Sequence, residues 1–141
     1  MNAKQLMREA ERARRSAYAP YSDFPVGAAL LTKSGRLIHG CNVENASFGL
    51  SVCAERNAVW KAVSAGERDF AAIAVTAKSG EGAPPCGSCR QVLHEFSPRV
   101  MVYWKDDHGR IVKRRLGALL ALPFDFASRR KKSRMPKRNK K

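Results

Sequence analysis

The order of strand-like and helix-like segments restricts this chain to few folds. Short apolar runs alternate with segments of helical periodicity, and two helical segments of about 10–15 residues separate strands. Such connections predict crossovers between parallel neighbours, whereas the Ser34–Gly35 turn predicts an antiparallel hairpin. The pattern favours the α/β class, as a three-layer sandwich with a mixed five-stranded sheet and helices on both faces. The predicted helices are 3–18, 53–65 and 87–96, and the predicted strands are 26–32, 36–42, 70–77, 100–104 and 111–114.

The chain divides into one folded domain and a strongly basic tail. Its 141 residues suffice for a single core without disulfides, and Trp60 and Trp104 are expected inside that core. Lys and Arg number 27 against 12 Asp and Glu, and nine of these basic residues stand in 128–141, where no acidic residue occurs. We expect residues 1–127 to fold and residues 128–141 to form a disordered tail that could bind polyanions.

The sequence also indicates in which cellular compartment the protein is expected. No apolar run approaches the roughly 18 residues of a transmembrane helix, so no membrane association is predicted. Residues 1–9 lack the apolar stretch of a secretory signal. We therefore expect a cytoplasmic protein with reduced thiols, in which cysteines bind metals or act in catalysis more often than they form disulfides.

Three of the four cysteines fall in two segments that each lead into a predicted helix. Cys53 precedes Glu55 by two residues, and Cys86 and Cys89 form a Cys-x-x-Cys pair. Zinc favours thiolate ligands, and helix N-termini stabilise thiolates. Three protein ligands leave the fourth tetrahedral position for water, which zinc activates as a nucleophile. The pattern predicts a catalytic site with one Zn²⁺ per chain, at which Glu55 moves protons without binding the metal.

Longer segments carry a resemblance to one enzyme family. Residues 20–30 (PYSDFPVGAAL), 41–46 (CNVENA), 53–56 (CAER) and 85–91 (PCGSCRQ) resemble, in order and spacing, segments of the small homotetrameric zinc-dependent cytidine deaminases. The resemblance covers about residues 3–126. It implies that family's fold and its reaction, the hydrolytic deamination of cytidine and 2′-deoxycytidine to uridine and 2′-deoxyuridine with release of ammonia, in pyrimidine salvage. Residues 1–127 would then be the catalytic domain.

At the metal, the resemblance implies Cys53, Cys86 and Cys89 as ligands and Glu55 as the proton shuttle. Three thiolates around Zn²⁺ leave a net negative charge, which weakens the metal as a Lewis acid. The resemblance implies that Arg56 hydrogen-bonds the zinc-bound sulfurs and offsets this charge without being a ligand.

For the substrate, the resemblance implies contacts from four residues. Asn42 and Glu44 would hold the ribose 3′ hydroxyl, and strand alternation places both on one face if the strand reaches that far. Phe24 would pack against the pyrimidine. The backbone N–H of Ala54 would bind the carbonyl of the base.

A further implied contact comes from a second subunit of the homotetramer. The family commonly ends with a phenylalanine that reaches a neighbouring subunit's active site. Phe126 fits the spacing from Pro123 best, and Phe124 is the alternative. Phe48 stands where a tyrosine is frequent, which removes a hydroxyl that could hydrogen-bond between subunits.

Several alternatives stay open. Cys41 as a fourth ligand would make the zinc structural, although a small, packed cysteine is the preferred interpretation. Cys86 and Cys89 could form a redox pair, which would leave Cys53 and Glu55 without a role. A deaminase acting on cytosine in RNA or single-stranded DNA is a rival enzyme, but an interior nucleotide lacks the free 3′ hydroxyl that the implied ribose contacts require. A structural zinc module that binds nucleic acid would have no use for a buried proton shuttle.

Overall fold

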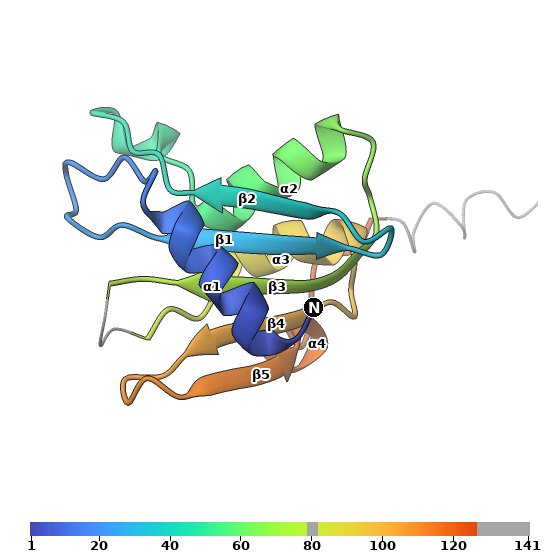
Figure 1. Ribbon diagram of the computed structural model, residues 1–141. Helices are drawn as coiled ribbons and strands as arrows, with labels where there is room; N and C mark the ends of the chain where they lie inside the picture. The colour runs from blue at the N-terminus through green and yellow to red at the C-terminus, as the bar shows by residue number, and fades with distance from the viewer. Residues whose placement is uncertain (79–81, 127–141) are drawn as a thin grey trace, which may run out of the picture.

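The computed structural model describes residues 1–78 and 82–126, which form a five-stranded sheet with helices on both faces (Figure 1). The predicted fold class is confirmed. The predicted tail 128–141 and the boundary at residue 127 lie outside the described residues. The strands are β1 (Gly27–Thr32), β2 (Leu37–Cys41), β3 (Phe70–Thr76), β4 (Met101–Lys105) and β5 (Ile111–Arg115), and the helices are α1 (Ala3–Arg14), η1 (Phe48–Leu50, 3₁₀), α2 (Ala54–Ser64), α3 (Gly87–Phe96) and α4 (Leu116–Leu119).

The sheet is mixed, with the strand order β2-β1-β3-β4-β5. Only the β3–β4 pair is parallel, and β1 pairs antiparallel with both β2 and β3. The expectation of parallel neighbours therefore holds for the crossover through α3 and fails for the crossover through α2. Strands β2 and β3 run in the same direction, but β1 lies between them because the hairpin has already placed it beside β2.

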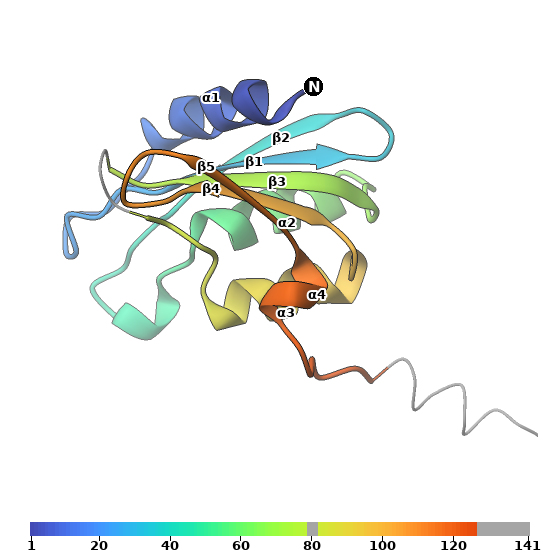
Figure 2. The ribbon, with the colours of Figure 1, turned by 90° about the horizontal axis from the view of Figure 1, so that it is seen from below.

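Two apolar layers enclose the sheet. Figure 2 shows α1 on one face and α2, α3 and α4 on the other. Successive side chains of a strand point to opposite faces, so Ala29 and Ala74 pack towards α1 whereas Leu30, Ile73 and Val75 pack towards α2 and α3. The small residues on the first face let α1 lie close to the strands.

Two predictions about local structure were wrong. Helix α1 ends at Arg14 instead of reaching residue 18. Tyr18 is extended there because its backbone N–H donates to the carbonyl of Asn42 and its carbonyl accepts from Glu44. Trp60 was expected in the core but is 48% exposed on α2, whereas Trp104 does pack against the core.

Two glycines allow helices to approach the sheet closely. A Cβ on Gly27 would lie 2.1 Å from the carbonyl oxygen of Ala10 in α1. A Cβ on Gly40 would lie 2.3 Å from the carbonyl oxygen of Ala54, the first residue of α2. Real Cβ atoms do not come this close to backbone, so Gly40 helps to fix where α2 begins relative to β2.

The topology brings three chain segments to one end of the sheet. Because β2 and β3 run in the same direction, the loops that leave them towards α2 and α3 begin at the same end. The antiparallel β1 begins there, so residues 20–26 arrive at the same place. In open α/β sheets the carboxyl ends of parallel strands commonly border ligand sites.

Candidate active site

The three predicted metal-binding cysteines come together at the starts of two helices. Cys53 is the N-cap residue of α2, Cys86 is the N-cap residue of α3, and Cys89 lies in the first turn of α3. Neither N-cap thiol makes a capping hydrogen bond to the backbone of its helix. The three sulfurs lie within 4.8 Å of one another, and those of Cys86 and Cys89 are 3.5 Å apart.

This cluster fits a zinc ion. Tetrahedral zinc with Zn–S bonds of about 2.3 Å requires sulfurs about 3.8 Å apart, close to the observed spacing. Within the described part of the chain, no other group of three or more Cys, His, Asp or Glu side chains is arranged to hold a metal. Three thiols are the soft ligands that zinc prefers over harder cations. The cluster of Cys53, Cys86 and Cys89 could therefore hold one zinc ion.

The surroundings of Cys53 favour its deprotonated thiolate form. A hydrogen bond from Cys89 and another from Arg56 lower the pKa of Cys53 to about 5, although partial burial opposes them. The Nη2 atom of Arg56 donates to the Cys53 sulfur at 3.3 Å, and its buried Nε atom has no hydrogen-bond partner among the described residues. Arg56 thus places positive charge against the sulfur cluster from within α2.

Glu55 lies beside this cluster and is only 5% exposed. Burial, together with the negative charge of the Cys53 thiolate, raises the pKa of Glu55 to about 7. A carboxyl with a pKa near neutrality can both accept and release a proton at physiological pH. Glu55, two residues after Cys53 in the first turn of α2, lines the same pocket as Cys53 and Cys86.

A pocket of about 470 Å³ extends from the cluster. Cys53, Cys86 and Glu55 lie in its wall together with four other predicted site residues, Phe24, Asn42, Glu44 and Ala54. As the first residue of α2, Ala54 has a backbone N–H without a partner inside the helix. These seven residues line the pocket, and Cys89 belongs to the adjacent sulfur cluster. Eight of the predicted residues therefore lie together at one end of the sheet.

Asn42 and Glu44 lie just beyond the end of β2. The strand stops at Cys41, and the chain continues through a bridge between Val43 and Val52. The amide of Asn42 accepts from the Val26 N–H at 2.8 Å and donates to the Phe24 carbonyl at 2.9 Å. Asn42 therefore ties the segment before β1 to the segment after β2.

Glu44 also hydrogen-bonds to the segment before β1, at Tyr21 and Ser22. Its Oε1 accepts from the backbone N–H groups of Tyr21 and Ser22, and its Oε2 accepts from the Ser22 hydroxyl. These bonds, above all the one from the Ser22 side chain, hold the pKa of Glu44 below its ordinary value. Glu44 is therefore a carboxylate at neutral pH.

The remaining predicted contact, Phe126, does not line the pocket of its own chain. Phe124 and Phe126 are 63% and 54% exposed and stack with ring centroids 6.4 Å apart. The Gln91 side chain anchors this segment, since it donates to the Phe124 carbonyl and accepts from the Phe124 N–H.

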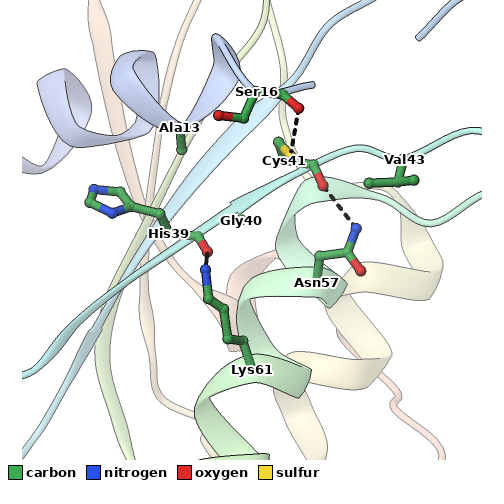
Figure 3. Close-up of a pocket in the computed structure, with 8 residues that line it drawn as sticks. All are labelled: Ala13, Ser16, His39, Gly40, Cys41, Val43, Asn57 and Lys61. Atoms are coloured by element: carbon green, nitrogen blue, oxygen red, sulfur yellow. Dashed lines mark hydrogen bonds between the residues drawn. The ribbon is translucent and has the colours of Figure 1, made fainter. Parts of the chain in front are cut away.

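Cys41 lies in a different pocket, at the outer edge of β2 (Figure 3). Its thiol donates to the Ser16 carbonyl, and burial raises its pKa. In the same pocket, Asn57 and Lys61 of α2 donate to the carbonyls of Cys41 and His39. Cys41 is not a member of the sulfur cluster, which speaks against a fourth protein ligand.

Two residues at the site were given no role by sequence reasoning. Ser22 bonds to Glu44, 22 residues later. Arg90 in α3 donates to the carbonyl of Pro85, just before Cys86, and to that of Leu119 at the end of α4. Both lie inside the segments that carry the family resemblance, but nothing in a single sequence indicates partners this distant.

None of the helices in the described ranges is long and apolar enough to cross a membrane.

Comparisons with known proteins agree with this geometry. Residues 1–105 match the model for the cytidine and deoxycytidylate deaminase zinc-binding region. The chain is 56% identical over 98 residues to a cytidine deaminase of Halalkalibacterium halodurans, covering 70% of this chain and 74% of the relative. It is 47% identical over 125 residues to a cytidine deaminase of Sporosarcina psychrophila, covering 88% of this chain and 92% of the relative. The crystal structure of cytidine deaminase from Burkholderia pseudomallei superposes with a TM-score of 0.83 at 47% identity, covering 88% of this chain and all of that one.

Proposed function

The chain belongs to the cytidine and deoxycytidylate deaminase family, and on this premise we propose that it hydrolyses cytidine and 2′-deoxycytidine to uridine and 2′-deoxyuridine, releasing ammonia. The observation that carries the proposal is the buried Glu55 beside three converging thiols, at the end of a pocket large enough for a nucleoside. A structural zinc site has no need for such a carboxyl.

The charge of the pocket favours a nucleoside over a nucleotide. None of the described residues in its wall is a lysine, arginine or histidine, whereas Glu44 and Glu55 both lie there. A phosphate group would meet carboxylates without a cation to pair with, and desolvating it would be costly. We therefore propose cytidine and 2′-deoxycytidine, not their monophosphates, as substrates.

In the proposed reaction the chain's own groups move the protons. Zinc, when bound by the three cysteines, acidifies water and supplies a hydroxide nucleophile. Glu55 accepts a proton from the attacking water and delivers one to the ring nitrogen N3. It then helps the amine at C4 to leave as ammonia, so that cytidine and water give uridine and ammonia. A pKa near 7 suits both halves of this exchange.

Other residues would orient the base and the sugar. The N–H of Ala54, which has no partner inside α2, would donate to the base carbonyl, and Phe24 would supply an apolar surface for the pyrimidine. Asn42 keeps one amide hydrogen and one lone pair beyond its two internal bonds, and Glu44 keeps an acceptor position on Oε2. These remaining positions can hold the ribose 3′ hydroxyl. Arg56 would offset the negative charge of the thiolates.

We propose that the enzyme is a homotetramer whose subunits supply Phe126, or alternatively Phe124, to a neighbour's site. The exposed apolar side chains support this, among them Phe48 and Leu50 at 72% and 67% exposure. Phe126→Ala should then lower turnover with the mass of the assembly unchanged in light scattering. Equal turnover in Phe126→Ala, with loss in Phe124→Ala, would reverse the assignment.

We further propose a cytoplasmic role in pyrimidine salvage and polyanion binding by the basic tail 128–141. A chain ending at Ala127 should deaminate cytidine at an unchanged rate, because a neutral substrate gains little from positive charge. The full chain should bind single-stranded RNA with an affinity that falls steeply with salt, and the shortened chain should bind weakly. Loss of cytidine turnover would place the tail inside the folded enzyme. Deamination of cytosine within an oligonucleotide by the full chain alone would favour the rival enzyme.

The substrate assignment is tested by ultraviolet spectroscopy. Purified protein should convert cytidine and 2′-deoxycytidine, and convert cytidine 5′-monophosphate far more slowly. Turnover should stop with a zinc chelator and return when zinc is added back. Conversion of the monophosphate in preference to cytidine would overturn the proposal.

A further inference from the structure

The loop that carries Phe24 is held by side chains from the segment after β2. Asn42 bonds to the backbone of Phe24 and Val26, and the carboxylate of Glu44 accepts three hydrogen bonds from Tyr21 and Ser22. The loop and the segment are also joined through their backbones, since Glu44 donates to the carbonyl of Tyr18. The two chain segments thus form one hydrogen-bonded unit at the mouth of the pocket.

Ser22 is the residue that joins both halves of this unit. Its hydroxyl donates to Oε2 of Glu44 at 2.5 Å and accepts from the Phe24 N–H at 3.1 Å. One side-chain oxygen therefore contacts the carboxylate proposed for the sugar and the backbone of the residue proposed for the base.

The local backbone conformation is what makes this possible. Asp23, between Ser22 and Phe24, has a φ of +51°, and its N–H donates to the Ala19 carbonyl. A residue other than glycine adopts this left-handed conformation at a cost, and Asp is among those that tolerate it best. The turn at Asp23 brings the Phe24 N–H back onto the Ser22 oxygen while Phe24 lines the pocket.

We propose that Ser22 is a positioning residue that orients the Glu44 carboxylate towards the 3′ hydroxyl of the sugar. The inference rests on the proposed function, because it assumes a nucleoside in the pocket. The Ser22 hydroxyl and the two backbone N–H groups occupy three of the four acceptor positions of Glu44 and leave one, on Oε2, for the substrate. Without the Ser22 hydroxyl, the Oε2 atom would be free to turn away or to bind water.

The test compares cytidine with 3′-deoxycytidine, which lacks the hydroxyl that Glu44 would bind. In Ser22→Ala, kcat/KM for cytidine should fall by about 10-fold, mainly through KM, because a hydrogen bond to a charged group is lost. For 3′-deoxycytidine kcat/KM should change much less, so the preference for cytidine should shrink by about the same 10-fold factor. Ser22→Thr keeps a hydroxyl and should retain the preference.

Ser47→Ala is the matched control. Ser47 is exposed, is not among the residues that line the pocket, and its side chain makes no capping bond to η1. This variant should keep the wild-type preference between the two nucleosides. The assignment is overturned if Ser22→Ala lowers kcat/KM equally for both nucleosides, or for neither.

A measurement independent of turnover separates this inference from the proposed function. In a ¹³C NMR titration, the pKa of the Glu44 carboxyl should be higher in Ser22→Ala than in wild type, since the Ser22 bond is the largest cause of its lowering. An equal pKa in both proteins would overturn the assignment whether or not cytidine is a substrate. If the wild-type protein fails to deaminate cytidine, the proposed function fails on that result alone.

Discussion

The two ends of the pocket are built in different ways. At the thiol end, Cys53, Cys86 and Cys89 lie at the starts of two helices, and each is placed by regular structure. At the sugar end, residues 18–26 and 42–44 have little regular structure and are held together by bonds from side chains to backbone. The thiol end therefore depends on helices and a metal, whereas the sugar end depends on a few polar side chains.

The largest expected effect is at the thiol end. Cys89→Ser replaces a buried sulfur with a poor zinc ligand and should abolish both bound zinc and turnover. Cys41→Ser is the matched control, because Cys41 lies outside the cluster, and it should keep zinc and activity. Metal content by mass spectrometry and the cytidine assay measure both. Loss of zinc in Cys41→Ser would restore the fourth-ligand interpretation.

Glu55→Gln should separate metal binding from chemistry. The amide keeps the shape of the side chain but cannot take up a proton, so turnover should fall by roughly 10²–10⁴-fold. Zinc content and melting temperature should stay at the wild-type level. A variant that loses its zinc would mean that Glu55 is a ligand and not a proton shuttle.

Arg56→Ala should have an intermediate effect. Turnover should drop by about 10–100-fold, as for other residues that contact metal ligands. The Arg56 charge lowers the pKa of Glu55, so its removal raises that pKa further. Because Glu55 must be deprotonated to accept a proton, the acidic limb of the pH–rate profile should move to higher pH. An unchanged profile and rate would make Arg56 an ordinary surface residue.

Asn42→Ala should give the smallest loss of turnover and a larger loss of stability. The Val26 N–H and the Phe24 carbonyl would lose their partner, which should lower the free energy of unfolding by about 1–3 kcal/mol. Asn45→Ala is the control, since Asn45 is exposed and, in the part of the chain that the structure describes, its side chain accepts only from the Ser47 N–H. Urea denaturation compares the variants. Equal stability in Asn42→Ala and wild type would contradict the hydrogen-bonded sugar end.

The sequence predicted the parts of the molecule that depend on short spacings. The grouping of Cys53, Cys86 and Cys89 was predictable because a Cys-x-x-Cys pair spans one helical turn and both segments precede helices. Helix α3 occurs at the predicted residues 87–96. The strands were likewise visible as short apolar runs between turn signals.

What the sequence did not predict depends on distant partners. The early end of α1 follows from bonds between Tyr18 and residues after β2, and the tie from Asn42 crosses 16 residues to Val26. The position of β1 between β2 and β3 is a property of the whole sheet. The exposure of Trp60 follows from which side of α2 meets β2, and apolar residues occur on both sides of that helix.

Turnover of cytidine as a function of zinc bound per chain shows whether one zinc ion at the three cysteines is required for the reaction. Protein stripped by a chelator would be titrated with zinc, and activity and bound metal would be measured on the same samples. The stripped protein should show no turnover, and turnover should rise linearly with bound zinc and level off at one zinc per chain. Full turnover without zinc, or activity that appears only after a second zinc has bound, would contradict this requirement.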